Sequence, residues 1–428
     1  MSAASADIAP TGAGQAVMAR LDELAAFTDE PGRITRLYLS PSHRAAAAQV
    51  AAWMEAAGMA THVDAAGNVV GRLEGEHPGL PALLLGSHID SIRDAGKYDG
   101  PLGVVAAIAA VDEIRRRGAL LPFAIEVLAF GDEEGIRFPT TLLGSRAVAG
   151  TFDERSLAAR DIEGISVEEA LRLFGCDPAA IPGAAKRRAE TLAYVEVHIE
   201  QGPVLERIGA PLGVVTAISG ASRFDVTVYG RAGHAGTTPM DLRWDAIAGA
   251  SEMVLAAEAI ARAAENIVAT VGMIAVPNGA TNVIPGLVRF SLDLRAPVDA
   301  DRAAAEMRIR AAFDAIAEQR RLSVSMVRYH DASATPCDPA LADGIAEAIA
   351  GLGLDVPRLA SGAGHDGMAI ASLCPIGMMF VRCKGGISHN PAESILAEDA
   401  DLAVRALVDF ILSFDPGRLQ RPPIGSTS

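Results

Sequence analysis

The chain has 428 residues, of which 50% are hydrophobic, 4% are aromatic and 21% are charged, and its formal net charge is -16. This length exceeds the usual size of one hydrophobic core, so two domains are expected. The acidic balance, which no basic block offsets, excludes nucleic acid and anionic lipid as partners, and no apolar run approaches the ~20 residues that cross a bilayer. The composition therefore predicts a soluble globular protein.

The N-terminus and the cysteines predict a cytoplasmic location. Residues 1–14 lack the basic start and the continuous apolar stretch of a secretory signal, and we expect them to form a disordered tail. Cys176, Cys337, Cys374 and Cys383 are scattered without CxxC spacing. This pattern is typical of reduced thiols and not of a disulfide framework or a structural zinc site.

The first predicted domain alternates short apolar runs with long amphipathic stretches. Apolar runs occupy residues 82–85 and 123–130, and a helical pattern lies between them at 102–117. This order predicts βαβ units and therefore an α/β fold with a mixed, largely parallel sheet flanked by helices. The segment 194–200 alternates strictly, which predicts a half-buried strand with its polar side chains, His198 among them, on one face.

A second module follows residue 218. Its pattern is strand 224–230, helix about 242–264, strand 267–276, strand 286–296, helix about 301–318 and strand 322–328. This is the βαββαβ order of a ferredoxin-like α+β unit. Because the module is complete, we expect residues 219–330 to form a domain inserted into a catalytic domain of residues 1–218 and 331–428. The first sheet would then be completed by helix 341–352, strand 376–382 and helix 398–414.

Histidines and carboxylates follow the predicted strands at the points where these strands end. They are His88 and Asp90 after the first strand, Asp99 in the Gly-rich loop that comes next, the adjacent pair Glu133 and Glu134, and then His198 and His389. In open α/β sheets the ligand crevice lies at the carboxyl ends of the strands. We therefore expect these side chains to form one site.

The residue types at these strand ends predict a metal site. Imidazole and carboxylate groups in this number suit a pair of zinc, manganese or cobalt ions. The predicted ligands are His88, Asp99, Glu134, His198 and His389. Asp99 would bridge the two ions, and Asp90 would orient the imidazole of His88 without binding metal itself. Adjacent side chains on an extended segment face opposite ways, so Glu133 would point away from the direction of Glu134 and be free to move a proton. The residues alone leave open a one-metal site or a site for another ion.

Several segments carry a family resemblance: GSHIDSIRDAGKYDGPLG, AFGDEEGIRFPTTLLGSRAVAG, YVEVHIEQGPVLE, GRAGHAGTTPMDLRWD, NVIPG, SGAGHDGMAIA and VRCKGGISHNPAE. Together they resemble the amidase/carbamoylase branch of the dinuclear metallopeptidase family. That branch contains allantoate amidohydrolase, N-carbamoyl-L-amino-acid hydrolase and β-ureidopropionase. The resemblance runs from about residue 43 to residue 414 and so covers nearly the whole chain.

The resemblance implies two divalent ions per subunit on the same five ligands, with Glu133 as catalytic base and the inserted domain as lid and homodimerisation unit. It also implies substrate contacts, some from the lid and some from the partner subunit, by Gln201, His234, Asn282 and Arg295. In this context we expect His234 to donate a hydrogen bond to the oxyanion and Arg295 to bind a carboxylate through its guanidinium. His365, in SGAGHDGM, is a further candidate substrate contact, with a structural role in a Gly-rich turn as an equal alternative.

The expected reaction is hydrolysis of a ureido or amide bond in a small substrate that carries a carboxylate. The metals would activate water while Glu133 takes its proton and passes it to the departing nitrogen, and turnover would depend on lid motion about hinges near Ile218 and Asp331.

Among substrates allantoate is the first choice, because SGAGHD, FVRCKGGISHNPAE and DAGKYDG are most similar to allantoate amidohydrolases. Its hydrolysis would give ammonia, carbon dioxide and ureidoglycine. N-carbamoyl-L-amino acids and β-ureidopropionate are the alternatives. A dinuclear aminopeptidase or deacylase is a third, and the histidine at position 198 argues against it, because such enzymes often have a carboxylate there.

Overall fold

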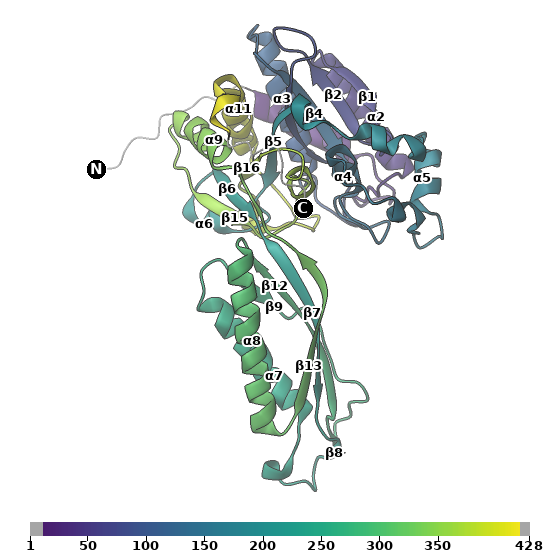
Figure 1. Cartoon of the computed structure of the whole chain (residues 1–428), viewed down its shortest axis with the longest axis vertical. Helices are drawn as coiled ribbons and strands as arrows, with labels where there is room; N and C mark the ends of the chain where they lie inside the picture. The colour runs from purple at the N-terminus through teal and green to yellow at the C-terminus, as the bar shows by residue number, and fades with distance from the viewer. Residues whose placement is uncertain (1–11, 420–428) are drawn as a thin grey trace, which may run out of the picture. The chain divides into compact units, whose positions relative to one another are not determined.

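The computed structural model describes residues 12–419, which separate into two compact units (Figure 1). The first unit runs to Thr216 and continues over Cys337–Leu359 and from Gly364 onward, and the second comprises Ala217–Pro336 with Ala360–Ala363. The second unit thus covers the predicted insertion, 219–330, and a few residues on either side of it. Within residues 12–419, no helix has the length and apolar character that crossing a bilayer requires.

The first helix begins inside the predicted N-terminal tail. Residues 1–11 of that tail lie outside the described residues. The prediction is wrong for Ala13 and Gly14, which are the first residues of helix α1 (Ala13–Ala25). The helix forms because Val17, Leu21 and Leu24 recur at helical spacing and are buried, and because the helix packs against α11 (Ala397–Ser413).

The first unit is a sheet covered by helices. The strand order is β1-β2-β4-β3-β5-β16-β6-β14, with β15 also paired to β6. The strands are β1 (Ala60–Val63), β2 (Val69–Leu73), β3 (Ala82–His88), β4 (Ala124–Phe130), β5 (Thr191–Ile199), β6 (Leu212–Ile218), β14 (Thr335–Pro336), β15 (Arg358–Ser361) and β16 (Ile376–Val381). Besides α1 and α11, the helices are α2 (Pro41–Ala56), α3 (Pro101–Arg116), α4 (Leu143–Ala149), α5 (Val167–Phe174), α6 (Val204–Ile208), α9 (Pro339–Gly351) and α10 (Gly367–Ile370).

The centre of this sheet is parallel, as predicted. Strands β4, β3, β5 and β16 are neighbours and all run in one direction. Every residue of β5 is buried, so the prediction of a half-buried strand is wrong. The reason is that β5 lies in the middle of the sheet and contacts α3 and α10. Its carboxylate Glu196 is accommodated because it accepts hydrogen bonds from the Ser87 hydroxyl at 2.8 Å and the Gly367 backbone N–H at 3.3 Å.

The second unit has the predicted α+β order, with an antiparallel sheet of order β10-β12-β7-β13 and β9 paired to β12. Its elements are β7 (Gly220–Tyr229), β8 (Gly233–His234), α7 (Ala246–Arg262), β9 (Val268–Thr270), β10 (Ile274–Ala275), β11 (Val283–Ile284), β12 (Leu287–Ala296), α8 (Asp299–Arg320) and β13 (Ser323–Ala332). The predicted strand 267–276 is two short strands. Thr270 pairs with Asp293 and Ile274 with Phe290, so the segment carries one residue more than its partner and breaks there.

Candidate metal centre

The parallel strands of the first unit deliver their polar side chains to one edge of the sheet. Because β4, β3, β5 and β16 are parallel neighbours, their carboxyl ends lie side by side. These ends carry Glu133 and Glu134 after β4, His88 as the last residue of β3, His198 in β5 and His389 after β16. Asp99 enters the same place from the loop that leads into α3, where Gly100 adopts a φ of 85°.

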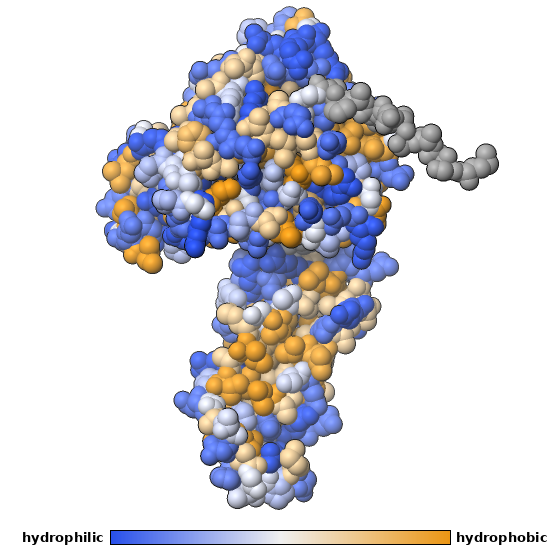
Figure 2. Space-filling model, turned by 180° about the vertical axis from the view of Figure 1, so that it is seen from behind, coloured by the Kyte–Doolittle hydropathy of each residue, from blue (hydrophilic) through white to orange (hydrophobic). Residues whose placement is uncertain are grey.

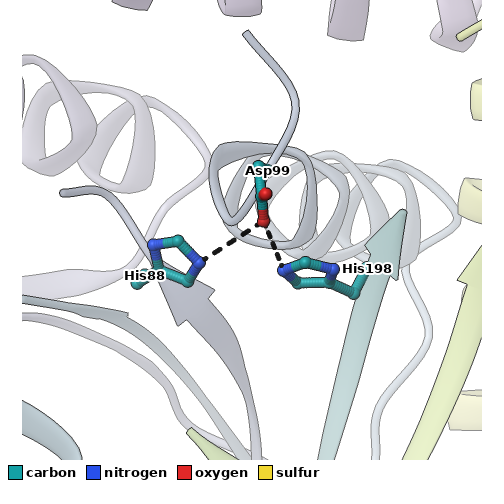
Figure 3. Close-up of side chains that lie close together, drawn as sticks. All are labelled: His88, Asp99 and His198. Atoms are coloured by element: carbon teal, nitrogen blue, oxygen red, sulfur yellow. Dashed lines mark ion pairs between the residues drawn. The ribbon is translucent and has the colours of Figure 1, made fainter. Parts of the chain in front are cut away.

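Three of these side chains meet around a single carboxylate oxygen (Figure 3). Oδ1 of Asp99 lies 3.2 Å from Nε2 of His198 and 3.9 Å from Nε2 of His88. All three side chains are buried, with exposed fractions of 1% for each imidazole and 7% for the carboxylate. Figure 3 shows the two rings pointing toward Asp99 from the ends of neighbouring strands. This arrangement can hold one metal ion.

A second group forms around the other oxygen of the same carboxylate. Nε2 of His389 lies 3.4 Å from Oδ2 of Asp99 and 3.5 Å from Oε2 of Glu134. Each group offers ligand atoms that lie within 4.8 Å of one another. The five predicted ligands therefore come together in two groups that share Asp99. Glu133 lies beside them, with Oε2 4.0 Å from Nε2 of His88.

The hydrogen bonds of the two buried histidines fit metal ligation. Nδ1 of His88 lies 3.0 Å from the carbonyl oxygen of Asp90, and Nδ1 of His198 lies 2.9 Å from that of Ile199. Because a carbonyl only accepts hydrogen bonds, each Nδ1 carries a proton, and in the neutral form of each ring Nε2 therefore offers a lone pair toward Asp99. Nε2 of His198 is buried without a hydrogen-bond partner among residues 12–419. A divalent cation between these lone pairs and the carboxylate would satisfy all three groups.

Burial and the charges of neighbouring groups shift the pKa values of the site residues. Burial lowers the pKa of His88 to about 4. Burial also opposes a charge on His198, but its contact with Asp99 raises the pKa of His198 to about 9. The pKa of Asp99 is low despite burial, because His198 and His88 lie against it. Burial, followed by repulsion from neighbouring carboxylates, raises the pKa of Glu133 and of Glu134 well above the ordinary value.

Asp90 holds the backbone that carries the two glutamates. Its carboxylate accepts from the N–H of Glu133 at 3.2 Å and from the N–H of Glu134 at 3.3 Å. The same carboxylate is 3.7 Å from Nδ1 of His88, so it is the Asp90 carbonyl that fixes the imidazole. Buried Arg36 supports this loop by donating from Nε to the carbonyl of Ile89 at 2.5 Å. Arg36 was not among the predicted residues, and no motif around it signals the contact.

Two polar side chains hold Oδ2 of Asp99. Gln201 donates to it from Nε2 at 2.8 Å, and the Ser388 hydroxyl donates at 2.5 Å. Gln201, predicted as a substrate contact, is thus bonded to a metal ligand, and its role with substrate stays a prediction. Ser388 was not predicted, although it precedes His389 in the quoted ISHNPAE segment. Gln201 and His389 have φ of 56° and 55°, a left-handed backbone that is uncommon outside glycine and often marks functional sites.

His365 lies behind the first group. Its side chain is 1% exposed, and its ring centroid is 4.4 Å from that of His198, with the ring planes at 66°. Burial lowers its pKa well below the ordinary value. This position supports the orientation of His198, and a contact between His365 and substrate stays a prediction.

The remaining predicted substrate residues lie in the second unit. His234 in β8 pairs with Val283 in β11, and the N–H of Ala235 donates to the carbonyl of Asn282 at 2.9 Å. The structure therefore brings His234 and Asn282 together. Arg295, near the end of β12, makes a two-pronged ion pair with Asp293 at 2.8 Å and 3.0 Å.

Comparisons with known proteins identify relatives that match most of this chain. The chain matches peptidase family M20/M25/M40 over residues 84–413. It is 42% identical to an allantoate deiminase of Arabidopsis thaliana, covering 92% of this chain and 81% of that protein. It is 41% identical to an N-carbamoyl-L-amino acid amidohydrolase of Geobacillus stearothermophilus, covering 92% and 97%. Among solved structures, an amidase of the hydantoinase/carbamoylase family from Burkholderia multivorans superposes with a TM-score of 0.88 at 33% identity, covering 94% and 97%.

Proposed function

Because this chain belongs to peptidase family M20/M25/M40, we propose that it is a metal-dependent amidohydrolase that cleaves the ureido C–N bond of allantoate. The observation that carries the proposal is the pair of ligand groups that share Asp99, with Glu133 beside them. The relatives that support it are named as an allantoate deiminase and an N-carbamoyl-L-amino acid amidohydrolase. The proposal includes a cytoplasmic location.

The cofactor we propose is a pair of zinc, manganese or cobalt ions. His88, Asp99 and His198 would hold one ion, and Asp99, Glu134 and His389 the other. Bound ions would lower the pKa of water and polarise the substrate carbonyl. Glu133 would accept a proton as water attacks and return it to the departing nitrogen.

The substrate assay that tests this function is ammonia release by the purified, Mn²⁺-reconstituted protein. We expect allantoate to be hydrolysed with a higher kcat/KM than any N-carbamoyl-L-amino acid or N-carbamoyl-β-alanine. Hydrolysis adds one water and yields ammonia, carbon dioxide and ureidoglycine. A preference for a carbamoyl amino acid would instead favour the alternative function, N-carbamoyl-L-amino-acid hydrolysis, which the Geobacillus relative supports. Ammonia from none of these compounds would contradict both.

The separation between the predicted substrate residues of the second unit supports a site that two copies of the chain share. Along β12, Leu287 pairs with Tyr229 and Arg295 pairs with Ala221. His234 and Asn282 lie beyond the Leu287 end. Arg295 is eight residues further along the strand, a separation of roughly 27 Å at about 3.4 Å per residue. One small substrate cannot touch both ends, so we propose that His234 and Asn282 act in the site of the partner subunit of a homodimer.

An apolar surface on the second unit supports that homodimer. Figure 2 shows apolar residues gathered on this unit. On α7, Leu255 is 64% exposed and Ile247 is 37% exposed, and on β9, which packs beside α7, Val268 is 56% exposed. Among residues 12–419, β12 is the one strand that pairs with β9, so the other edge of β9 offers unpaired backbone groups to a second copy. Exposed apolar surface of this kind is typical of a protein interface.

Mixing two inactive variants tests the shared site. Glu133→Gln and His234→Ala homodimers are each expected to be inactive. After subunit exchange at a 1:1 ratio, half of the dimers would be mixed and each would hold one complete site, so about a quarter of wild-type activity should return. Glu133→Gln mixed with Asp99→Asn should recover nothing, because both changes lie in the first unit. No recovery in the first mixture, with exchange verified by mass, would show that each site is complete within one chain.

A further inference from the structure

The segment that carries His389 contacts the Asp99 loop at three points. Ser388 donates to Oδ2 of Asp99 at 2.5 Å, and His389 lies 3.4 Å from the same oxygen. Four residues after His389, Glu393 reaches the backbone of the loop at Tyr98 and Asp99. One short segment therefore contacts both the side chain and the backbone of the ligand that the two metal groups share.

Glu393 makes the backbone contact through one oxygen. Its Oε1 accepts from the N–H of Tyr98 at 2.8 Å and from the N–H of Asp99 at 3.0 Å. Glu393 is 5% exposed, so bulk water has little access to this carboxylate.

The loop is shaped to admit this carboxylate. A Cβ at Gly96 would lie 2.4 Å from each of three Glu393 atoms, Cβ, Cδ and Oε1. Contacts that short do not occur, so the approach of Glu393 depends on a residue without a side chain at this position. The backbone of Gly96 has no positive φ, so the requirement for glycine here is one of space and not of conformation.

We propose that Glu393 is a positioning residue that fixes the backbone of Asp99 and thereby ties the two ligand groups to each other. Asp99 supplies Oδ1 to one group and Oδ2 to the other, so a shift of its backbone displaces both groups together. The inference rests on one part of the proposed function, namely that the site binds a divalent metal ion. Partners behind metal ligands commonly change metal affinity by about 10- to 100-fold when they are removed.

The test is the affinity for Mn²⁺, measured by calorimetric titration of the metal-free protein. Glu393→Ala is expected to weaken binding by about 10- to 100-fold. Glu393→Gln should stay within a few-fold of wild type, because its amide oxygen can still accept both hydrogen bonds. Gly96→Ala leaves the carboxylate in the chain but pushes it away from the loop, and should weaken binding as Glu393→Ala does.

Asp64→Ala provides a matched control for lost stability. Oδ1 of Asp64 also accepts two backbone hydrogen bonds, from Ala66 at 2.9 Å and Asn68 at 3.0 Å, and the residue is 9% exposed. Asp64 is in neither metal group. This variant should lower Tm and leave Mn²⁺ affinity unchanged.

Wild-type affinity in both Glu393→Ala and Gly96→Ala would overturn the inference. So would an equal loss of affinity in Asp64→Ala, because the effect would then be one of general stability. A wild-type protein that binds Mn²⁺ but releases no ammonia from any ureido substrate would defeat the proposed function alone, since the affinity comparison is still made on that protein.

Discussion

Replacing Glu133 by glutamine is expected to lower kcat by about 10²- to 10⁴-fold while the bound metal stays at the wild-type amount. Glutamine keeps the size of the side chain and cannot take or return a proton. Glu133 is near His88 but is absent from the two groups that share Asp99, so its loss should leave those groups complete. Ammonia release and metal content by mass spectrometry measure the two effects on one preparation.

Glu134→Gln is the matched control for this variant. Glu134 is adjacent in sequence and its pKa is raised by the same causes, burial first, but its Oε2 lies 3.5 Å from Nε2 of His389. This variant should lose metal affinity as well as activity. Because His88, Glu133 and Glu134 also lie within ligand distance of one another, the opposite result, metal loss in Glu133→Gln and retention in Glu134→Gln, would exchange the two roles.

Asp99→Asn is expected to remove most of the metal and with it the activity. The shared carboxylate supplies one oxygen to each group, and an amide offers only one oxygen and no charge. In wild type, Mn²⁺ at 100 times its Kd should stabilise the fold by about 2.7 kcal/mol. The rise in Tm on adding Mn²⁺ should therefore be clear in wild type and nearly absent in Asp99→Asn.

Asp132→Asn separates this effect from a general response to losing a buried acid. Asp132 lies two residues after the end of β4, is fully buried, and accepts from the Thr140 hydroxyl at 2.8 Å. Burial, followed by repulsion from Asp90, raises its pKa well above the ordinary value, a shift that favours the neutral carboxyl, which asparagine resembles. This variant should keep the Mn²⁺-dependent rise in Tm. A rise of wild-type size in Asp99→Asn would show that Asp99 does not bridge two ions.

The nature of the fold followed from local patterns. The apolar runs at 82–85 and 123–130 became β3 and β4, and the helical spacing between them became α3. Such patterns are readable because burying one face of a helix or strand constrains residues close together in sequence. The same reasoning was wrong for β5, since alternation cannot indicate whether a second layer covers the polar face. It also missed the break between β9 and β10, which depends on register against β12.

The meeting of these side chains was also predictable, because histidines and acids that follow neighbouring parallel strands are brought to the same edge of the sheet. The supporting contacts were not. Arg36 and Glu393 act on the site through backbone groups of Ile89, Tyr98 and Asp99. Because every residue carries the same backbone groups, its residue type does not indicate that a distant side chain contacts its backbone. Only the three-dimensional structure identifies such a contact.

The sequence by itself determined which residues could bind metal and that they follow strands, because residue type and strand periodicity are local properties. Only the tertiary structure decided which strand ends are neighbours. The order β4-β3-β5-β16 results from hydrogen bonding and helix packing between segments far apart in the chain, and it alone brings His389 to the same carboxylate as His88 and His198. The pairing along β12 likewise separates Arg295 from His234, because a strand is stiff and extended.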